Sequence, residues 1–304
     1  MKIKQLFFNL FKKLSCLVSG KGLAKLPFAT KIYQFIYKKL KPNGIIEIIT
    51  AENHKMFVDS RDTGMAPYFI MHGDFIPDES EVLKKILKPG MIFIDVGANI
   101  GYFSLIAAKL VGGQSNGKGM VFAFEPDENN FSLLQKNINA NGYKNIIAIK
   151  KAVSDKVSTA KFYLEKENLC AHSLTPKTNC DFTEVETISL DEYFKDKKID
   201  PVRGPSLKTT TLVKQKDFAS NGVDVVKIDV EGMEPAVLRG MENLIKANES
   251  MAIITEYYPK AISNAGYSPN DYLESLKKSG FRLVNFGNQN GKLVNILCLK
   301  NFEY

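Results

Sequence analysis

The fold is decided by the stretch Met91-Ile-Phe-Ile-Asp95-Val-Gly97-Ala-Asn99-Ile-Gly101-Tyr-Phe-Ser104. The apolar run from Met91 to Val96 is long enough for a buried strand and too short for a helix. Gly97 and Gly101 follow in a turn, and the residues from 102 to 110 predict a helix. Glycine is needed where a strand turns sharply into a helix, because a Cβ would block backbone approach to a ligand. The stretch therefore predicts a strand, a ligand-binding turn and a helix.

A second apolar run, Met120-Val-Phe-Ala-Phe, ends in Glu125-Pro126-Asp127. A carboxylate at the tip of the second strand of a doubly wound fold is placed to accept from both hydroxyls of a nucleoside ribose. Pro126 ends the strand, and Asp127 is suited to cap the helix that runs to about residue 141. Glu125 is thus predicted to bind a ribose, and an ordinary solvated strand-end glutamate is the alternative.

A third run, Val225-Val-Lys227-Ile-Asp229-Val-Glu231-Gly232, places charged residues at alternate positions of a hydrophobic strand. Alternate residues of a strand share a face, so Lys227, Asp229 and Glu231 should point to one side. Charges on a central strand are costly unless they are paired or used. This triplet predicts a functional site, and an edge strand with one wet face is the alternative.

Together these segments resemble the FkbM family of S-adenosylmethionine-dependent methyltransferases, within the wider Rossmann-like class. The residues that carry the resemblance are Asp95, Gly97, Asn99, Gly101, Phe124-Glu125-Pro126 and the run from Lys227 to Gly232. Shorter matches are Ala152-Val-Ser154-Asp155, Thr187-Ile-Ser-Leu190-Asp191 and Glu256-Tyr-Tyr-Pro259. The resemblance covers about residues 70 to 300. It implies S-adenosyl-L-methionine as cofactor and O-methylation, often of a sugar or polyketide hydroxyl.

The resemblance also implies roles for individual residues. Those expected to bind the cofactor are Asp95, Gly97, Asn99 and Gly101 at its methionine portion, Glu125 at its ribose and Asp155 near its adenine. An alcohol acceptor needs a base, since its oxygen is a poor nucleophile until the proton leaves. The candidates for the acceptor side are Asp229, Glu231 and Glu256, and the sequence leaves open which of them is the base. His172 is an alternative base. The same carboxylates are also suited to hold a divalent cation, although no spacing in the sequence requires one.

The order of predicted elements indicates an α/β fold, a class I methyltransferase sandwich. Strands and helices alternate, which favours a mostly parallel seven-stranded sheet with helices on both faces. The last two strands are separated only by a Gly/Asn-rich turn, so we expect an antiparallel C-terminal hairpin. Further strands are predicted at residues 45–50, 55–59, 146–150, 161–164, 251–256, 281–286 and 294–299, and helices at 78–87, 235–246 and 269–278.

Two regions stand apart from this pattern. Residues 1–44 are predicted to form a basic amphipathic helical extension, followed by a methyltransferase domain at 45–304. Residues 195–224 are polar and lack sustained periodicity, so they predict an insertion in that domain. On a helical wheel, seven apolar residues share one arc opposite Lys2, Lys12 and Lys13: Ile3, Leu6, Phe7, Leu10, Phe11, Leu14 and Leu17. Such a helix either lies on an anionic membrane surface or packs on the protein or a partner.

Composition narrows the function further. The chain has 41 Lys and Arg against 33 Asp and Glu, but residues 1–42 hold ten lysines and no acidic residue. The remainder is therefore close to neutral, and no nucleic-acid partner is expected. The four cysteines and three histidines show no metal-binding spacing, so no metal is expected. We expect a reduced cytoplasmic enzyme that acts on a small-molecule or glycan acceptor, with residues 1–20 as the segment for peripheral contact with the inner membrane face.

Two rival enzyme classes follow from parts of the pattern. The strand, glycine turn and acidic residue alone are compatible with a nucleotide-cofactor oxidoreductase of the NAD type. Its usual fingerprint has a third glycine where this chain has Tyr102, and its strands usually continue in parallel. A nucleic-acid methyltransferase would carry an Asn/Asp-Pro-Pro-aromatic motif after the fourth strand, where this chain has Asp229-Val-Glu-Gly232. A non-catalytic scaffold is the remaining alternative.

Overall fold

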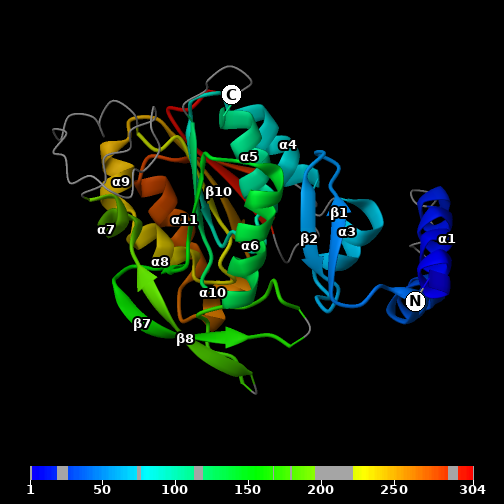
Figure 1. Cartoon of the computed structure of the whole chain (residues 1–304). Helices are drawn as coiled ribbons and strands as arrows, with labels where there is room; N and C mark the ends of the chain where they lie inside the picture. Colours follow the sequence, from blue (N-terminus) through cyan, green and yellow to red (C-terminus); the bar gives the residue numbers. More distant parts are fainter. Residues whose placement is uncertain are drawn as a thin grey trace. The chain divides into compact units, whose positions relative to one another are not determined.

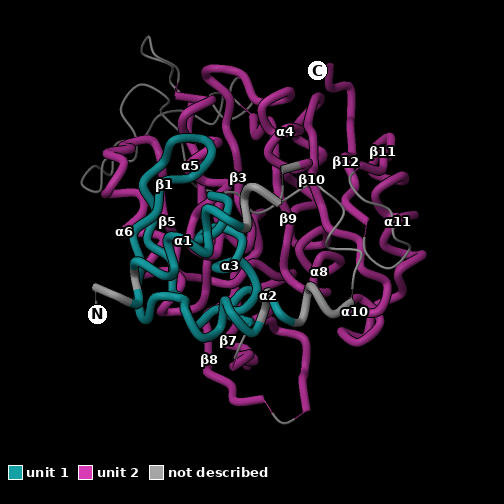
Figure 2. Tube along the Cα trace, turned by 90° about the vertical axis from the view of Figure 1, so that its right-hand side faces the viewer, with its two compact units in different colours: residues 1–75, 167–170 teal, residues 76–166, 171–304 magenta. Residues whose placement is uncertain are grey.

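The computed structural model describes residues 2–18, 27–73, 77–112, 119–166, 168–178, 180–195, 222–286 and 294–303 (Figure 1). The chain divides into two compact units, which are coloured separately in Figure 2. Unit 1 comprises residues 1–75 and 167–170, and unit 2 comprises residues 76–166 and 171–304. The division into an extension at 1–44 and a methyltransferase domain at 45–304 is a functional one and stays a prediction.

Unit 2 is built on a seven-stranded sheet with the order β11-β12-β10-β9-β3-β4-β5. Its strands are β3 Ile92–Val96, β4 Met120–Phe124, β5 Ile146–Ile149, β9 Val225–Ile228, β10 Met251–Tyr257, β11 Arg282–Phe286 and β12 Val294–Lys300. The pairs from β10 to β5 are parallel, whereas β12 runs antiparallel to both β10 and β11. The predicted mostly parallel sheet with an antiparallel C-terminal hairpin is confirmed.

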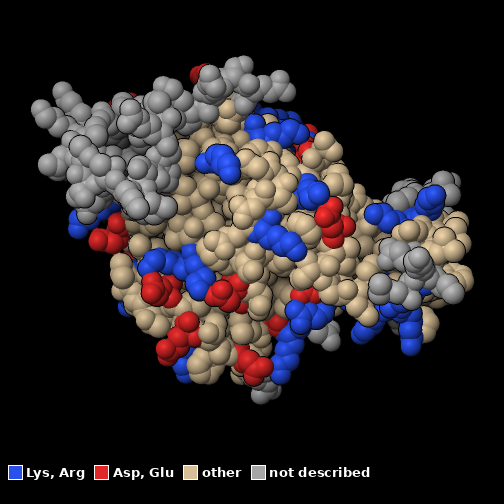
Figure 3. Space-filling view, in the orientation of Figure 1, with Lys and Arg blue, Asp and Glu red and all other residues tan. Residues whose placement is uncertain are grey.

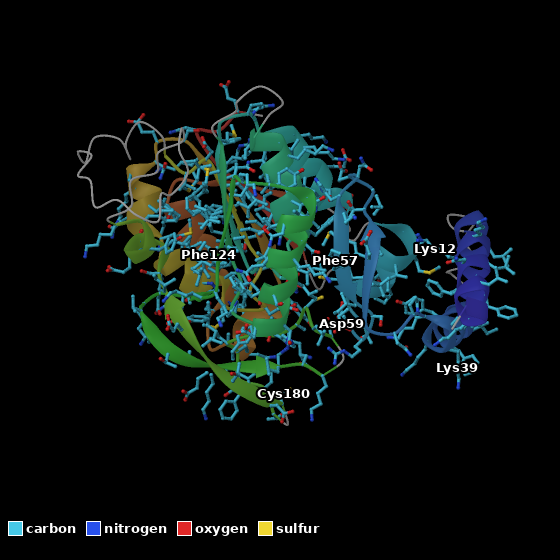
Figure 4. All side chains as sticks on the ribbon, viewed as in Figure 1. Lys12, Lys39, Phe57, Asp59, Phe124 and Cys180 are labelled. Carbon is cyan, nitrogen blue, oxygen red and sulfur yellow. The ribbon has the colours of Figure 1, made fainter. Side chains whose placement is uncertain are left out.

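The composition of the central strands explains why the sheet could be predicted from the sequence. Every residue of β3, β4 and β9 is buried, because helices cover both faces of the sheet and leave no strand face in water. Phe124, at the end of β4, lies within the densely packed side chains of this unit (Figure 4). Such strands read as continuous apolar runs, which is the pattern that the sequence shows.

Helices lie on the two faces of this sheet (Figure 1). On one face are α4 Pro77–Ile86, α5 Tyr102–Gly112 and α6 Glu128–Asn141. On the other are α7 Leu190–Phe194, α8 Glu234–Arg239, α9 Glu242–Ala247 and α11 Pro269–Lys278. The short helix α10 Pro259–Asn264 follows β10. Asp127 caps α6 as predicted, since its side chain accepts from the backbone N–H groups of the first helical turn.

Two details differ from the sequence prediction. The helix predicted at 235–246 is broken into α8 and α9 at Gly240, where a Cβ would lie 2.1 Å from the carbonyl oxygen of Ser154. The strand predicted at 161–164 belongs to a separate three-stranded sheet, β6 Ala152–Val153, β8 Asp181–Ile188 and β7 Ser158–Leu164. The close approach at Gly240 and the pairing within the three-stranded sheet each join segments that are separated in the sequence. Most of the predicted insertion, residues 196–221, lies outside the described residues.

Unit 1 contains two helices, a hairpin and a further short helix. Its elements are α1 Lys2–Val18, α2 Pro27–Leu40, β1 Ile45–Ile49, β2 Lys55–Asp59 and α3 Ala66–His72. The predicted hairpin is confirmed by antiparallel pairing of β1 with β2. Phe8 of α1 is buried, with its ring centroid 6.2 Å from that of Tyr37 on α2. In the described part of the chain, no helix is both long and apolar enough to span a bilayer.

Candidate functional site

The glycine turn and Glu125 meet directly. The backbone N–H of Asn99 donates to Glu125 Oε2 at 2.8 Å, and the N–H of Asp127 donates to Oε1 at 2.9 Å. Asn99 itself has a left-handed backbone, with φ of 51°. Glu125 is buried, and burial raises its pKa to about 8. The parallel pairing of β3 with β4 thus places the two segments predicted to bind the cofactor at one edge of the sheet.

Gly97 brings the third segment to the same place. Its φ is 83°, and a Cβ at this position would lie 2.0 Å from the backbone carbonyl oxygen of Asp229. The reason is that β3 and β9 are neighbours, so the turn after β3 passes the end of β9. Gly101, with φ of 92°, similarly passes close to the side chain of Leu134 on α6.

Asp95 lies beneath the turn and is almost completely buried. Its Oδ2 accepts from the Ser104 hydroxyl of α5 at 2.5 Å. Among the described residues, its Oδ1 has no hydrogen-bond partner and is buried. Burial is the main cause that raises the Asp95 pKa. A buried acceptor without a donor is costly, which is typical of a site where a ligand completes the hydrogen bonds.

Lys227 is buried at the centre of the site, on β9. Its Nζ donates to Asp229 Oδ2 at 2.8 Å, lies 3.8 Å from Glu79 Oε2 and stands 4.7 Å from the centre of the Phe103 ring. Burial alone would lower the Lys227 pKa, but the neighbouring carboxylates more than offset it and the pKa is raised. Lys227 therefore stays a cation that is shared between carboxylates.

Glu79 and Phe103 were not predicted as site residues. Glu79 lies in the first turn of α4 and is only 5% exposed. An acidic residue in the first turn of a helix ordinarily complements the helix dipole, so nothing in its local sequence distinguishes it. Burial raises the Glu79 pKa to about 7, although Lys227 lowers it. Only the packing of α4 against the sheet reveals the role of this residue.

The turn after β9 differs from the prediction of an extended strand. β9 ends at Ile228, and Glu231 has a left-handed backbone with φ of 56°. Lys227 and Asp229 do point to one side, as their contact shows. Glu231 does not continue the strand face, because its left-handed backbone turns the chain, and the hydroxyls of Ser173 and Thr175 each donate to its carbonyl oxygen at 3.1 Å. Neither hydroxyl was predicted to belong to the site.

A buried glutamate supports the same turn from within. Glu234, at the start of α8, is 1% exposed, and its Oε1 accepts from the N–H groups of Val230 at 3.2 Å and Gly232 at 3.1 Å. Burial raises the Glu234 pKa to about 7 despite these hydrogen bonds. Glu256, the residue before the end of β10, has its pKa raised to about 10 by burial and by the carboxylates of Asp229, Glu231 and Glu234. The predicted acceptor-side carboxylates are therefore electrostatic neighbours.

Two of the predicted candidates, Asp155 and His172, lie outside the turns described above. Asp155 is exposed in the turn between β6 and β7, where its Oδ1 accepts from the Ser154 hydroxyl at 3.3 Å. No hydrogen bond joins it to the other predicted site residues in the described structure. His172 accepts the Glu165 N–H through Nδ1 at 2.9 Å, and its ring meets Phe162 edge to face. This hydrogen bond occupies the Nδ1 lone pair, which weakens the case for His172 as the base.

The described residues contain no group of three His, Cys, Asp or Glu side chains arranged to hold a metal ion. Within the same residues, no disulfide includes Cys170, Cys180 or Cys298.

The chain matches known methyltransferase sequences. A model of the Methyltransferase FkbM domain matches residues 95–283, more than half of the 304-residue chain. The 31-O-demethyl-FK506 methyltransferase FkbM of Streptomyces tacrolimicus is 28% identical over 169 residues. That match covers 52% of this chain and 62% of the relative, so this chain spans less than two thirds of the relative's length.

Solved structures with similar folds have low sequence identity. The methyltransferase FkbM of Methylobacillus flagellatus KT is 14% identical with a TM-score of 0.41, over 72% of this chain and 50% of that one. A SAM-dependent methyltransferase of Aquifex aeolicus is 16% identical with a TM-score of 0.41, over 73% and 90%. An rRNA methylase of Streptococcus thermophilus is 14% identical with a TM-score of 0.41, over 74% and 95%.

Proposed function

Because the chain belongs to the FkbM family of S-adenosylmethionine-dependent methyltransferases, we propose that it methylates a hydroxyl of a sugar, glycan or similar small molecule. The observation that carries the proposal is the group of carboxylates after β9 and at the end of β10, beside the glycine turn. A carboxylate within reach of a hydroxyl removes its proton as the oxygen attacks. Asp229, Glu231 and Glu256 are the catalytic candidates.

The residues at the turn fit the cofactor. The buried Oδ1 of Asp95, which has no donor among the described residues, suits an ammonium group such as that of the methionine portion. Gly97, Asn99 and Gly101 let the backbone approach that portion without a Cβ in the way. Each oxygen of Glu125 accepts one backbone N–H and retains a further lone pair for a ribose hydroxyl. When bound, the cofactor supplies an electrophilic methyl group on a sulfonium.

Asp155 is proposed to lie near the adenine, on the strength of the sequence match alone.

The residues that support oxygen as the acceptor atom are those after β9. There, Lys227 holds Asp229 by an ion pair, whereas no Lys or Arg of the described residues forms an ion pair with Glu231 or Glu256. The name of the Streptomyces relative specifies transfer to an oxygen of that relative's own substrate. A hydroxyl acceptor is the common chemistry that we propose for this chain.

The same electrostatics disfavour a nucleic acid as acceptor. Lys227 is the one buried Lys or Arg in the described structure, and it is surrounded by acidic side chains. The carboxylates that gather around it and the neighbouring turns are Glu79, Asp95, Asp229, Glu231, Glu234 and Glu256. The one buried cation is thus already surrounded by carboxyl groups and is not available to a phosphate, whereas a hydroxyl forms hydrogen bonds with a carboxyl group in either protonation state.

The test is transfer from tritium-labelled S-adenosylmethionine. Purified protein should label a glycan extract in a base-stable form, as expected of a methyl ether, and should leave total RNA unlabelled. Label in RNA with none in glycans would overturn the proposed acceptor class. Calorimetry should show binding of S-adenosylhomocysteine and none of NAD, which separates cofactor binding from the choice of acceptor.

We also propose that unit 1 attaches the enzyme peripherally to the inner face of the cytoplasmic membrane. Large apolar side chains are exposed on both helices: Leu6, Phe7, Leu10 and Leu14 on α1, and Ile32 and Phe35 on α2. On the face shown in Figure 3, Lys and Arg side chains (blue) lie on the part of the chain that α1 and α2 form, and residues 1–42 contain no Asp or Glu. Exposed apolar groups beside lysines match the interface of an anionic bilayer.

A further inference from the structure

The acceptor-side carboxylates differ in how freely each can take a proton. Asp229 is held by the Lys227 ammonium at 2.8 Å, so its Oδ2 is already occupied by a hydrogen bond. Glu234 is buried, and its Oε1 accepts two backbone N–H groups. Burial, and then the carboxylates of Asp229, Glu231 and Glu234, raise the Glu256 pKa to about 10, so it is a poor proton acceptor. Glu231 is half-buried, and no described residue makes a hydrogen bond to its carboxylate.

The backbone of Glu231 is also held by hydrogen bonds on both sides of the residue. A left-handed conformation is unfavourable for a residue with a Cβ, and it persists only where surrounding contacts hold it. Ser173 and Thr175 hold its carbonyl oxygen from one side, and the Glu234 carboxylate holds the N–H groups of the two flanking residues from the other. Backbone strain that several contacts maintain is typical of a residue whose side chain must keep one orientation.

We propose that Glu231 is the general base of the acceptor site and that Ser173 and Thr175 are positioning residues that aim it. The inference rests on the proposed O-methyl transfer. The Glu231 carboxylate takes the hydroxyl proton while the acceptor oxygen forms its bond to the methyl carbon. The carbon–sulfur bond breaks with its electron pair on sulfur, so a carboxylate and a sulfonium become a carboxylic acid and a neutral thioether.

The charges around Glu231 suit this role. Burial, and then the carboxylates of Asp229, Glu234 and Glu165, raise its pKa to about 7, while the Lys177 ammonium acts in the opposite direction. Glu256, on β10, faces it as an additional acidic group. A base is most effective when its pKa lies near the working pH, because it is then both ionised and able to hold the proton. The rate should consequently rise with pH through about pH 7.

Kinetics on the glycan extract test the proposal. Glu231→Gln should lower kcat by about 10²-fold or more, with unchanged affinity for S-adenosylhomocysteine. Ser173→Ala combined with Thr175→Val should lower kcat and move the rise of the pH–rate profile to lower pH, and Thr175→Ser alone should retain the wild-type profile. Ser275→Ala removes a comparable hydroxyl-to-carbonyl hydrogen bond on exposed α11 and should change nothing. Full activity of Glu231→Gln would overturn the assignment.

A readout without an acceptor separates this proposal from the choice of substrate. In protein labelled with ¹³C-glutamate, the carboxyl signal that Glu231→Gln removes should titrate near pH 7. In the Ser173→Ala/Thr175→Val variant the same signal should titrate nearer the ordinary glutamate value. A Glu231 signal that titrates at the ordinary value in the wild type, or is unmoved by the double variant, contradicts the positioning role. If the wild type labels no glycan but these shifts appear, the acceptor class is wrong and the positioning of Glu231 stands.

Discussion

At position 97 only glycine fits, because any larger side chain would collide with the neighbouring backbone of the site. Gly97→Ala would place a Cβ 2.0 Å from the Asp229 carbonyl oxygen and would add a left-handed backbone cost of about 1–2 kcal/mol. We expect it to abolish binding of S-adenosylhomocysteine and to lower the free energy of unfolding. Gly142→Ala is the matched control, since Gly142 has φ of 71° but nothing within 4 Å of a Cβ. Equal losses in urea unfolding and calorimetry for the two variants would show that the close approach is unimportant.

Glu125 is expected to act through cofactor affinity. Glu125→Ala removes the acceptor for the proposed ribose hydroxyls and for two backbone N–H groups, so it should weaken binding of S-adenosylhomocysteine by about 10- to 100-fold. Turnover at saturating cofactor should change little. Glu128→Ala, at an exposed glutamate in the first turn of α6, is the control. A loss confined to turnover would place Glu125 on the acceptor side.

Lys227 should be the most costly side chain of the site to replace. Lys227→Met keeps an apolar stem against Phe103 but leaves buried carboxylates without a cation, which should cost about 3–5 kcal/mol of unfolding free energy. Adding Glu79→Gln should recover part of this loss, because one uncompensated charge is then gone. Lys277→Met breaks an exposed ion pair with Glu274 and should cost at most about 1 kcal/mol. Urea unfolding of the four proteins tests the coupling, and an unchanged Lys227→Met would refute it.

At the scale of elements, the pair α1 and α2 carries the prediction about location. Phe8 and Tyr37 pack the helices together, while Leu10 and Leu14 stay exposed. The wild type should co-sediment with phosphatidylglycerol-containing vesicles in low salt and lose binding as salt rises, since each lysine near an anionic surface contributes about 1 kcal/mol. Deletion of residues 1–20, or Leu10→Asp with Leu14→Asp, should abolish co-sedimentation.

The control for the vesicle experiment comes from unit 2. Val157 is also an exposed apolar residue, but it lies in the turn before β7, so Val157→Asp should bind vesicles as well as the wild type. If the truncated protein still co-sediments, or if neither protein does, α1 is a structural element and the proposed membrane contact is wrong.

At the scale of the whole molecule, the buried carboxyls should make stability fall as pH rises. The pKa values of Glu79, Glu231 and Glu234 are raised to about 7, that of Glu125 to about 8 and that of Glu256 to about 10. Between the ordinary glutamate value and these values the native state binds more protons than the unfolded chain. Stability therefore declines with increasing pH across this window.

We expect a higher unfolding temperature at about pH 5.5 than at about pH 8.5, in the absence of cofactor. Glu256→Gln has no proton to lose at this position, so its unfolding temperature should fall less between the two pH values. Thermal unfolding monitored by circular dichroism measures both effects. A stability that rises over the same interval would mean that the native carboxyls are ionised more easily than in the unfolded chain.

The local sequence was sufficient to predict the central strands and to suggest several residues of the candidate site. The apolar runs of β3, β4 and β9 are buried on both faces, so their composition alone marks them as central strands. The roles of Asp127 and Gly97 can likewise be predicted from the sequence, because a helix cap and a left-handed turn restrict which residue types fit. Parallel pairing then places the ends of these strands at one edge of the sheet, where Glu125 and Asp229 were predicted to lie.

Tertiary structure alone decided the contacts between distant segments. Glu79 on α4 and Ser173 after β7 reach the site across long stretches of chain, and neither has a local pattern that distinguishes it from a first-turn acid or a loop serine. The close approach of the Ser154 carbonyl to Gly240 is of the same kind, since it joins two distant segments. Periodicity and turn chemistry act over a few residues, whereas the partners of a buried charge or a strained turn are chosen by packing. The sequence therefore determined which elements form, and packing determined which side chains complete the site.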